Sequence, residues 1–168
     1  MFYALCDYFY ARREENEMKI AVGCDHAGIH LKPLLIDYLE KNGIGYTDFG
    51  TKTEDSCNYA EYGAKVAEEV AAGHYDFGIL ICGTGIGMSI VANKVPGIRC
   101  AHCTDEFSAR ATRMHNDANV LACGERITGP GVFLDIVKAF LSTPFEGGRH
   151  LARIAKITET EEKYSVKK

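Results

Sequence analysis

Apolar and polar positions along the chain follow two patterns, one typical of strands and one typical of helices, and a strand-like run followed by a helical segment occurs five times. Short apolar runs are typical of buried strands, and each precedes a longer segment with apolar residues at helical spacing. The strand-like runs cover residues 19–24, 44–50, 77–82, 97–103 and 118–123. The helical segments cover residues 29–42, 61–73, 87–95, 106–115, 131–141 and 147–164. This order predicts an α/β protein, a three-layer αβα Rossmann-like fold with a five-stranded parallel sheet and an extra C-terminal helix.

Polar residues follow most of the predicted strands. In parallel α/β sheets, ligands bind beyond the carboxyl ends of the strands. The segments at that edge are Asp25 and His26, residues 50–59, residues 82–87, Thr104 and Asp105, and residues 124–126. His115 and Asn116 precede the fifth strand, so they can join such a site only from another direction, such as another subunit.

Length and composition favour one globular domain. The chain has 168 residues, of which 46% are hydrophobic, enough to bury a core without disulfides. Its net charge of −4 argues against a general nucleic-acid binder. We expect the domain at residues 18–160, an N-terminal extension at residues 1–17 and a tail at residues 161–168. The apolar part of the extension is short and contains Asp7, so neither a membrane helix nor a secretory signal is predicted.

Most of the seven cysteines lie inside or beside strand-like runs. This placement predicts reduced, buried thiols in a cytoplasmic protein. Cys100 and Cys103 form a CxxC pair, but no second pair follows at the spacing of a zinc site. On a strand, a separation of three residues sends the two sulfurs to opposite faces, so we predict no metal site there.

The stretch GILICGTGIG, residues 78–87, leads from a strand into a glycine-rich turn through Cys82. It lacks the Gly-Lys pair of a P-loop and the GxGxxG spacing of a dinucleotide site. Met88 stands where a cysteine phosphatase would place its arginine, and no partner thiol follows for redox exchange. A cysteine at a helix entrance can instead become a thiolate that accepts a proton. The alternative is that Cys82 only ends a buried strand.

Four motifs carry a family resemblance: GCDHAG, ICGTGIGMSIVANKVPGIR, HNDANVLACGERITG and FEGGRHLARI. In this order and spacing, the chain from Met18 to about Ile157 resembles the ribose-5-phosphate isomerase B family, whose relatives include galactose-6-phosphate isomerase subunits. The resemblance implies interconversion of ribose 5-phosphate and ribulose 5-phosphate through an enediolate, without metal or cofactor. It also implies a homodimer or tetramer whose active sites contain residues of two subunits.

The resemblance implies the chemical roles as well. Cys82 would be the base that moves a proton between C1 and C2, and His115 would open the furanose ring. The developing negative oxygen would be stabilised by Thr84 and by three backbone amides, those of Gly83, Gly85 and Gly87. Asp25 and Asn116 would hold sugar oxygens. Cationic side chains would bind the phosphate: Arg126, Arg149 and Arg153, with help from His26 and His150.

The residues themselves support part of this assignment and leave alternatives open. Enolisation needs a base and donors aimed at the developing charge, and the loop at Cys82 offers both. Arg149 and Arg153 are four residues apart, so on a helix they share one face, as two cations binding one phosphate should. The alternative for them is a solvated helix face. The alternative for His115 is a histidine stabilised by the helix C-terminus.

The loop residues have alternatives too. Asp25 and His26 could cap a helix that starts near Ala27. Tyr59, expected to line the pocket, could be ordinary packing. Relatives in the family carry Asp-Tyr-Pro where this chain has residues 58–60, Asn-Tyr-Ala, which makes the sugar preference less secure than the type of reaction.

Two other functions remain open. The first is isomerisation of another phosphate, such as galactose 6-phosphate, allose 6-phosphate or a tetrose phosphate. The second is a sugar-phosphate binding module without catalysis, against which the retention of Cys82 and His115 weighs. His30 and His74 are expected at the surface with no assigned role.

Overall fold

A computed structural model describes residues 18–165 of the chain. The extension expected at residues 1–17 lies outside the described residues, as do residues 166–168. The strands are β1 (Lys19–Cys24), β2 (Gly45–Asp48), β3 (Phe77–Cys82), β4 (Cys100–His102) and β5 (Val120–Gly124). The helices of this part are α2 (Lys32–Lys41), α3 (Tyr59–Ala71), α4 (Ile86–Ala92), α5 (Glu106–Asn116), α6 (Pro130–Ser142) and α7 (Arg149–Tyr164).

The five strands form one sheet in the order β2-β1-β3-β5-β4, and all neighbouring pairs are parallel. The predicted α/β fold with a five-stranded parallel sheet is therefore confirmed. From β1 the chain goes to β2 on one side and then to β3 on the other. Such a change of winding direction marks the place where α/β proteins bind ligands, beyond the carboxyl ends of the two strands. Asp25 directly follows β1, and Cys82 ends β3.

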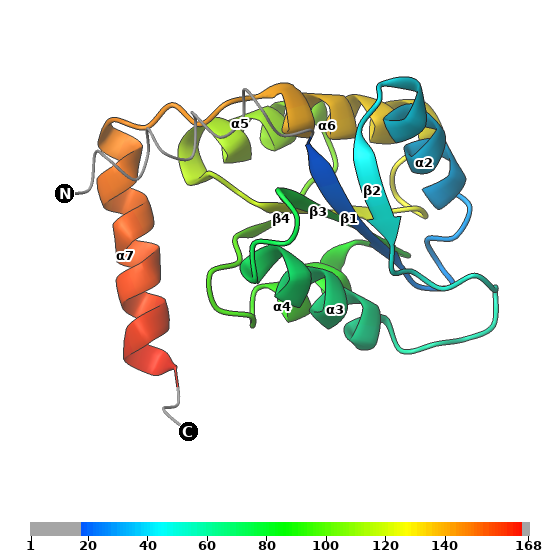
Figure 1. The fold of residues 1–168 in the computed structure, drawn as a ribbon, viewed down its shortest axis with the longest axis horizontal. Coiled ribbons are helices and arrows are strands. Elements are labelled where there is room, and N and C mark those ends of the chain that lie inside the picture. Colours follow the sequence, from blue (N-terminus) through cyan, green and yellow to red (C-terminus); the bar gives the residue numbers. More distant parts are fainter. Residues whose placement is uncertain (1–17, 166–168) are drawn as a thin grey trace.

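Helices cover both faces of the sheet (Figure 1). One face is covered by α2, α5 and α6, and the other by α3 and α4. Side chains of β3 alternate between the two cores, because successive residues of a strand point to opposite faces. Ile79 and Ile81 enter the core on the α2 side, whereas Leu80 and Cys82 enter the core on the α3 side. Burial on both faces explains why this strand is an unbroken apolar run.

Two glycines let α3 lie close to the sheet. A Cβ atom at Gly23 of β1 or at Gly78 of β3 would come within 2.8 Å of Val66 in α3. Real side chains do not tolerate so short a contact, so glycine is required for this helix position. The packing places Tyr59, the first residue of α3, near the carboxyl edge of the sheet.

The structure differs from the predicted boundaries at α2. The periodic pattern begins at residue 29, but the helix begins at Lys32. The carboxylate of Glu125 explains the delay, because it accepts the backbone N–H groups of His30 and Leu31 at 2.8 and 2.9 Å. These two residues therefore form a turn held from the end of β5.

Helix α7 stands to one side of the sheet and its covering helices (Figure 1). It contacts the rest of the protein near both ends. Near its start, His150 is 4% exposed, and near its end the Glu161 carboxylate accepts the N–H of Gly97 at 3.0 and 3.2 Å. Between them, Leu151 and Ile157 are about half exposed. The helix continues beyond residue 160 to Tyr164. No helix within residues 18–165 is both long and apolar enough to cross a bilayer.

Candidate active site

Cys82 ends β3 and contributes its side chain to the core under α3 and α4. The residue is 5% exposed, so it is nearly but not completely covered. Its sulfur accepts a hydrogen bond from the backbone N–H of Gly85 at 3.1 Å. A backbone N–H directed at sulfur stabilises negative charge on it. The sulfur therefore has a partner suited to an anionic thiolate.

The remaining strand cysteines have different surroundings. The Cys24 thiol donates to a backbone carbonyl at 3.8 Å, and burial raises its pKa to about 11. Burial likewise raises the pKa of Cys103 to about 11 and raises the pKa values of Cys100 and Cys123. Cys100 packs on the α3 side of the sheet and Cys103 on the α2 side. The predicted placement of the CxxC sulfurs on opposite faces is confirmed.

The loop after Cys82 is held in shape by glycines. Gly85 has φ of +79°, and a Cβ atom there would lie 2.6 Å from the His102 ring. A Cβ atom at Gly124, the last residue of β5, would lie within 2.6 Å of the Thr84 backbone. Both positions exclude a side chain, so the loop rests directly on the end of β5.

Hydrogen bonds tie this loop to the segment after β5. The N–H of Glu125 donates to the Cys82 carbonyl at 2.9 Å, and the N–H of Arg126 donates to the Gly83 carbonyl at 3.0 Å. Because the Glu125 carboxylate also holds the turn before α2, three loops at the carboxyl edge are linked. Sequence reasoning missed this role of Glu125, which depends on contacts between residues 95 positions apart.

Two predicted binding residues border the loop. A Cβ atom at Gly87 would lie 2.7 Å from the Tyr59 ring, so that ring packs closely against the start of α4. A Cβ atom at Gly83 would lie 3.5 Å from the Arg126 guanidinium carbon. Asn58 caps α3 with its side chain, the task that an aspartate at that position would also perform. Tyr59 is 44% exposed, so much of its surface is free to contact a ligand.

Asp25 and His26 lie in the turn after β1. The Asp25 carboxylate accepts the N–H of Ala27 at 2.9 Å, five residues before α2 begins, so Asp25 shapes a local turn and does not cap α2. The His26 Nδ1 atom accepts the N–H of Cys57 at 3.3 Å and lies 3.6 Å from its sulfur. This contact joins the β1 turn to the loop before α3.

His115 and Asn116 lie at the opposite edge of the sheet. Helix α5 starts beyond the carboxyl end of β4 and runs back, so its last turn lies beside the start of β5. The five residues of β5 span about 17 Å at roughly 3.3 Å per residue. One chain therefore does not bring His115 and Cys82 to the same small sugar phosphate.

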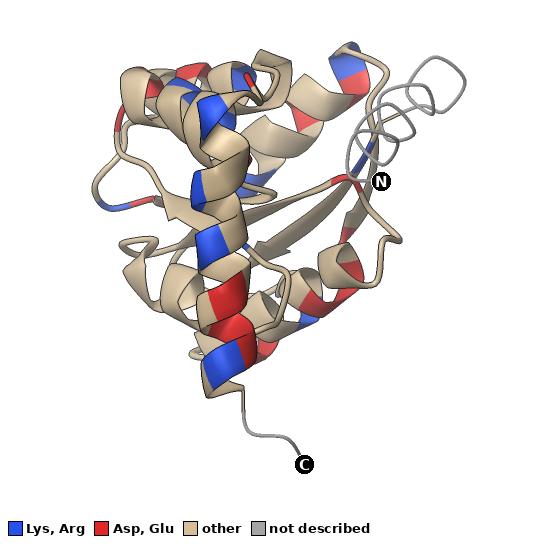
Figure 2. Cartoon of the chain, turned by 90° about the vertical axis from the view of Figure 1, so that its left-hand side faces the viewer, with Lys and Arg blue, Asp and Glu red and all other residues tan. Residues whose placement is uncertain are grey.

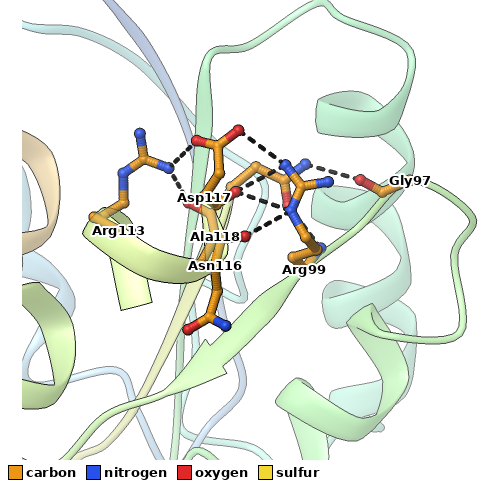
Figure 3. A network of polar contacts seen from close by, with 7 residues as sticks. Gly97, Arg99, Arg113, Asn116, Asp117 and Ala118 are labelled. Carbon is orange, nitrogen blue, oxygen red and sulfur yellow. Dashed lines mark hydrogen bonds and ion pairs between the residues drawn. The ribbon is translucent and has the colours of Figure 1, made fainter. Parts of the chain in front are cut away.

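Two arginines hold the turn that ends α5 (Figure 3). Asp117 has φ of +45°, and its carboxylate accepts from Arg113 at 2.8 Å and from Arg99 at 3.1 Å. Arg113, only 3% exposed, also donates to the Ala118 carbonyl at 2.6 Å. Arg99 donates to the Asn116 carbonyl at 2.9 Å. This network fixes the backbone directly after His115 and Asn116.

The first turns of α7 concentrate positive charge (Figure 2). Arg149 and Arg153 are exposed and one turn apart, while acidic residues occupy the later turns. Cations at a helix N-terminus oppose the helix dipole, which is positive there, and cost stability. Bound anions relieve that cost, because the N-terminal N–H groups and the arginines attract the same charge. The arrangement suits a phosphate group.

His115, Glu146 and His150 form a compact cluster of potential metal ligands, with ligand atoms within 4.8 Å of one another. The two imidazole rings are stacked, with centroids 4.5 Å apart and planes 12° apart. Nitrogen lone pairs lie in the ring planes, so lone pairs of parallel stacked rings do not converge on one ion. The cluster as it stands is not a preformed metal centre. Sequence reasoning did not identify Glu146 as a member of this cluster. The only local signal was the pair of glycines directly after it, which indicates a tight turn.

Comparison with known proteins places this fold and site in a family. The model of the ribose/galactose isomerase family matches residues 20–157. A solved structure of ribose-5-phosphate isomerase B from Clostridium thermocellum superimposes with a TM-score of 0.87 at 54% identity, covering 88% of this chain and 100% of that one.

Two curated relatives are similar over nearly their whole length. Ribose-5-phosphate isomerase B of Escherichia coli (strain K12) is 46% identical, covering 86% of this chain and 97% of its own. A D-erythrulose-4-phosphate isomerase of Pectobacterium atrosepticum is 43% identical, covering 83% of this chain and 93% of its own. Fold, site and relatives together define a sugar-phosphate isomerase. Within that class, the chain belongs to the ribose-5-phosphate isomerase B family.

Proposed function

We propose that the enzyme interconverts ribose 5-phosphate and ribulose 5-phosphate, with Cys82 as the general base. The observation that carries this proposal is the Cys82 sulfur at the β1–β3 switch point, with the Gly85 N–H directed at it. A thiol that acts as the base for enolisation must be able to form a thiolate beside the substrate. Burial raises the pKa values of the other strand cysteines, which makes them poor candidates for this base. Cys82 is the strand cysteine whose sulfur accepts a backbone N–H.

In the proposed reaction, the Cys82 thiolate removes the proton from C2 of the open-chain aldose. The electron pair of that C–H bond forms the C1–C2 double bond, and O1 becomes negative. The proton returns to C1 from the thiol while the O2 hydroxyl proton is transferred to O1, which yields the ketose. No electrons enter or leave the pair of substrate carbons, so the step balances without an oxidant or a cofactor.

The negative oxygen needs donors on the same side as the base. Thr84 is exposed two residues after Cys82, and the adjoining amides are those of Gly83, Gly85 and Gly87. Removing one such donor typically costs about 10²–10³-fold in rate. The Gly85 amide serves the sulfur in the free enzyme. As the proton arrives at sulfur, the sulfur loses its negative charge and that amide becomes available to the oxygen.

The rest of the site comes from a second subunit in this proposal. The separation of His115 from Cys82 within one chain supports a homodimer in which the α5 and α7 residues of one subunit face the β1–β3 edge of the other. The exposed apolar residues Leu151 and Ile157 of α7 support such a contact. His115 would open the furanose ring, and Asn116 with Asp25 would hold sugar oxygens.

Phosphate binding in the dimer combines both edges. His26 and Arg126 would contribute from the carboxyl edge of one subunit, and Arg149 and Arg153 from α7 of the other. A tetramer would be two such dimers. We also place the enzyme in the cytoplasm, because the six cysteines of the described part are free thiols.

A tetrose 4-phosphate is the second candidate substrate. The relative named for D-erythrulose 4-phosphate is almost as similar as the one named for ribose 5-phosphate, 43% against 46% identity. Identity therefore does not separate the two sugars. The Asn-Tyr-Ala run at residues 58–60 stands in place of the family's Asp-Tyr-Pro and includes Tyr59, which we place in the sugar pocket.

A substrate panel tests the reaction and the sugar together. We expect the highest kcat/KM for ribose 5-phosphate among ribose 5-phosphate, erythrulose 4-phosphate, allose 6-phosphate and galactose 6-phosphate. Turnover in D₂O should place deuterium at C1 of ribulose 5-phosphate, because a thiol proton exchanges with solvent. A higher kcat/KM for another sugar would overturn the substrate, and complete retention of the original hydrogen would overturn the base mechanism.

Subunit mixing tests the shared site. Cys82→Ala and His115→Ala homodimers should each be inactive, and exchange between them should recover activity, because a mixed dimer contains one complete site. Mixing Cys82→Ala with Cys82→Ser is the matched control and should recover none. Absence of recovery despite subunit exchange proved by mass-tagged chains would refute the two-chain site.

A further inference from the structure

The clearest feature outside the proposed chemistry is the ring of His150 stacked on His115. The two planes are 12° apart with centroids at 4.5 Å, although one residue lies in the last turn of α5 and the other in the first turn of α7. The Glu146 carboxylate lies beside both, 3.5 Å from His150 Nε2 and 4.0 Å from His115 Nε2. The stacking is thus part of a three-residue cluster.

His150 is covered while His115 is accessible. His150 is 4% exposed, and neither of its buried ring nitrogens has a hydrogen-bond partner in the described part of the chain. The His115 side chain is 41% exposed. Burial lowers the pKa of His150, as do the neighbouring His115, Arg149 and Arg153, while Glu146 acts in the opposite direction. A ring covered in this way has little surface left for a phosphate and is well suited to packing against another ring.

The backbone is built to bring this ring to His115. The N–H of Glu146 donates to the Met114 carbonyl at 3.1 Å, which joins the segment to the last turn of α5. Gly147 and Gly148 both have positive φ, +64° and +54°, and this double turn starts α7 directly over His115. Any other residue would be strained in these conformations.

We propose that His150 is a positioning residue. Its ring face holds the His115 imidazole in the orientation needed to open the furanose ring. Through this contact it also links the His115 imidazole to the phosphate-binding turn of α7. This inference rests on the proposed function. In this view His150 touches no substrate. It acts through His115, while Arg149 and Arg153, on the same helix, are kept in register with the sugar ring.

The test compares three variants of the full-length enzyme. His150→Ala removes the stacking face, His150→Phe keeps a flat ring but no nitrogen, and His115→Ala marks complete loss of the ring opener. Each is assayed for kcat and KM on ribose 5-phosphate and for the inhibition constant of inorganic phosphate. Thermal unfolding and subunit composition are measured alongside.

We expect His150→Ala to lower kcat by about ten- to hundredfold, because misplacement of a reacting group by about 1 Å has effects of that size. His150→Phe should recover most of the lost kcat, and the phosphate inhibition constant should stay within about twofold in both variants. Because the aromatic variant fills the same space, it keeps the proposal testable if His150→Ala does not fold.

Each other outcome has a distinct meaning. If both His150 variants weaken phosphate inhibition by tenfold or more, His150 binds phosphate and the proposal is wrong. If His150→Phe is as slow as His115→Ala, a ring nitrogen is required and stacking is not the role. If His150→Ala is normal while His115→Ala is inactive, the positioning role alone fails. If His115→Ala is itself normal, ring opening by His115 fails and the positioning role of His150 fails with it, whereas the proposed reaction at Cys82 fails only if the substrate panel or the D₂O experiment contradicts it.

Discussion

Replacement of Cys82 by alanine separates a catalytic thiol from a core thiol. A positioned general base contributes about 10²–10⁴-fold, so kcat should fall by at least about 10²-fold. The structural cost is smaller. Cys82 is 5% exposed, so losing one sulfur atom from the core costs about 1–2 kcal/mol. Leaving the Gly85 N–H without its acceptor adds about 1 kcal/mol.

These costs leave a folded protein, since domains of this size are stable by about 5–15 kcal/mol. Cys82→Ser should be more stable than Cys82→Ala, because its hydroxyl still accepts from Gly85, yet equally slow, because a hydroxyl is a far weaker base. Cys24→Ala is the matched control: it also removes a buried strand cysteine, from the opposite face, and should leave kcat unchanged.

The assay follows ketose formation from ribose 5-phosphate at saturating substrate, with thermal unfolding measured on the same samples. A Cys82→Ala enzyme with normal kcat would refute the general-base assignment and make Cys82 a core residue. Equal loss of kcat in Cys82→Ala and Cys24→Ala would also refute it, because the loss would then follow from core packing.

Three further changes have expected outcomes. Arg149→Ala should raise KM at least tenfold with kcat nearly unchanged, because phosphate binding is shared by substrate and transition state; Lys156→Ala on the same helix should leave KM alone, and a pure kcat defect in Arg149→Ala would contradict the role. Gly85→Ala should lower Tm and kcat more than Gly97→Ala, because both have positive φ but only Gly85 lacks space for a Cβ atom; equal Tm losses would contradict this account. The pKa of His150 is lowered by folding from 6.5, so the unfolded state binds the proton first as pH falls. Unfolding free energy should therefore decrease as pH falls below about 6.5, and His150→Phe should flatten that decrease; an unchanged pH profile would contradict it.

The fold was predictable because the two hydrophobic periods are local properties of the chain. The run at residues 77–82 is apolar at every position, and the structure buries it on both faces. Boundaries were less predictable where distant residues decide them. Helix α2 starts three residues later than its pattern because Glu125, far along the chain, binds the preceding N–H groups.

The candidate site divides in the same way. Cys82 and its glycines could be found from the sequence because the cysteine, the turn and the helix entrance are contiguous. The cluster at Glu146 and His150 could not be found from the sequence, because nothing in the spacing of residues 146–150 shows that His150 will stack on His115, 35 positions earlier. The catalytic role of Cys82 and the positioning role of His150 are predictions.

The sequence by itself determined the order of strands and helices, the reduced state expected of the strand cysteines and the thiol at the end of β3, since each follows from neighbouring residues. Only the tertiary structure decided that β1 and β3 meet at the switch point, and that His150 stacks on His115. The reason is that sheet order and helix direction arise from packing between segments far apart in the chain. In the proposed homodimer, that packing makes His115 and Arg149 of one subunit complete the site at Cys82 of the other.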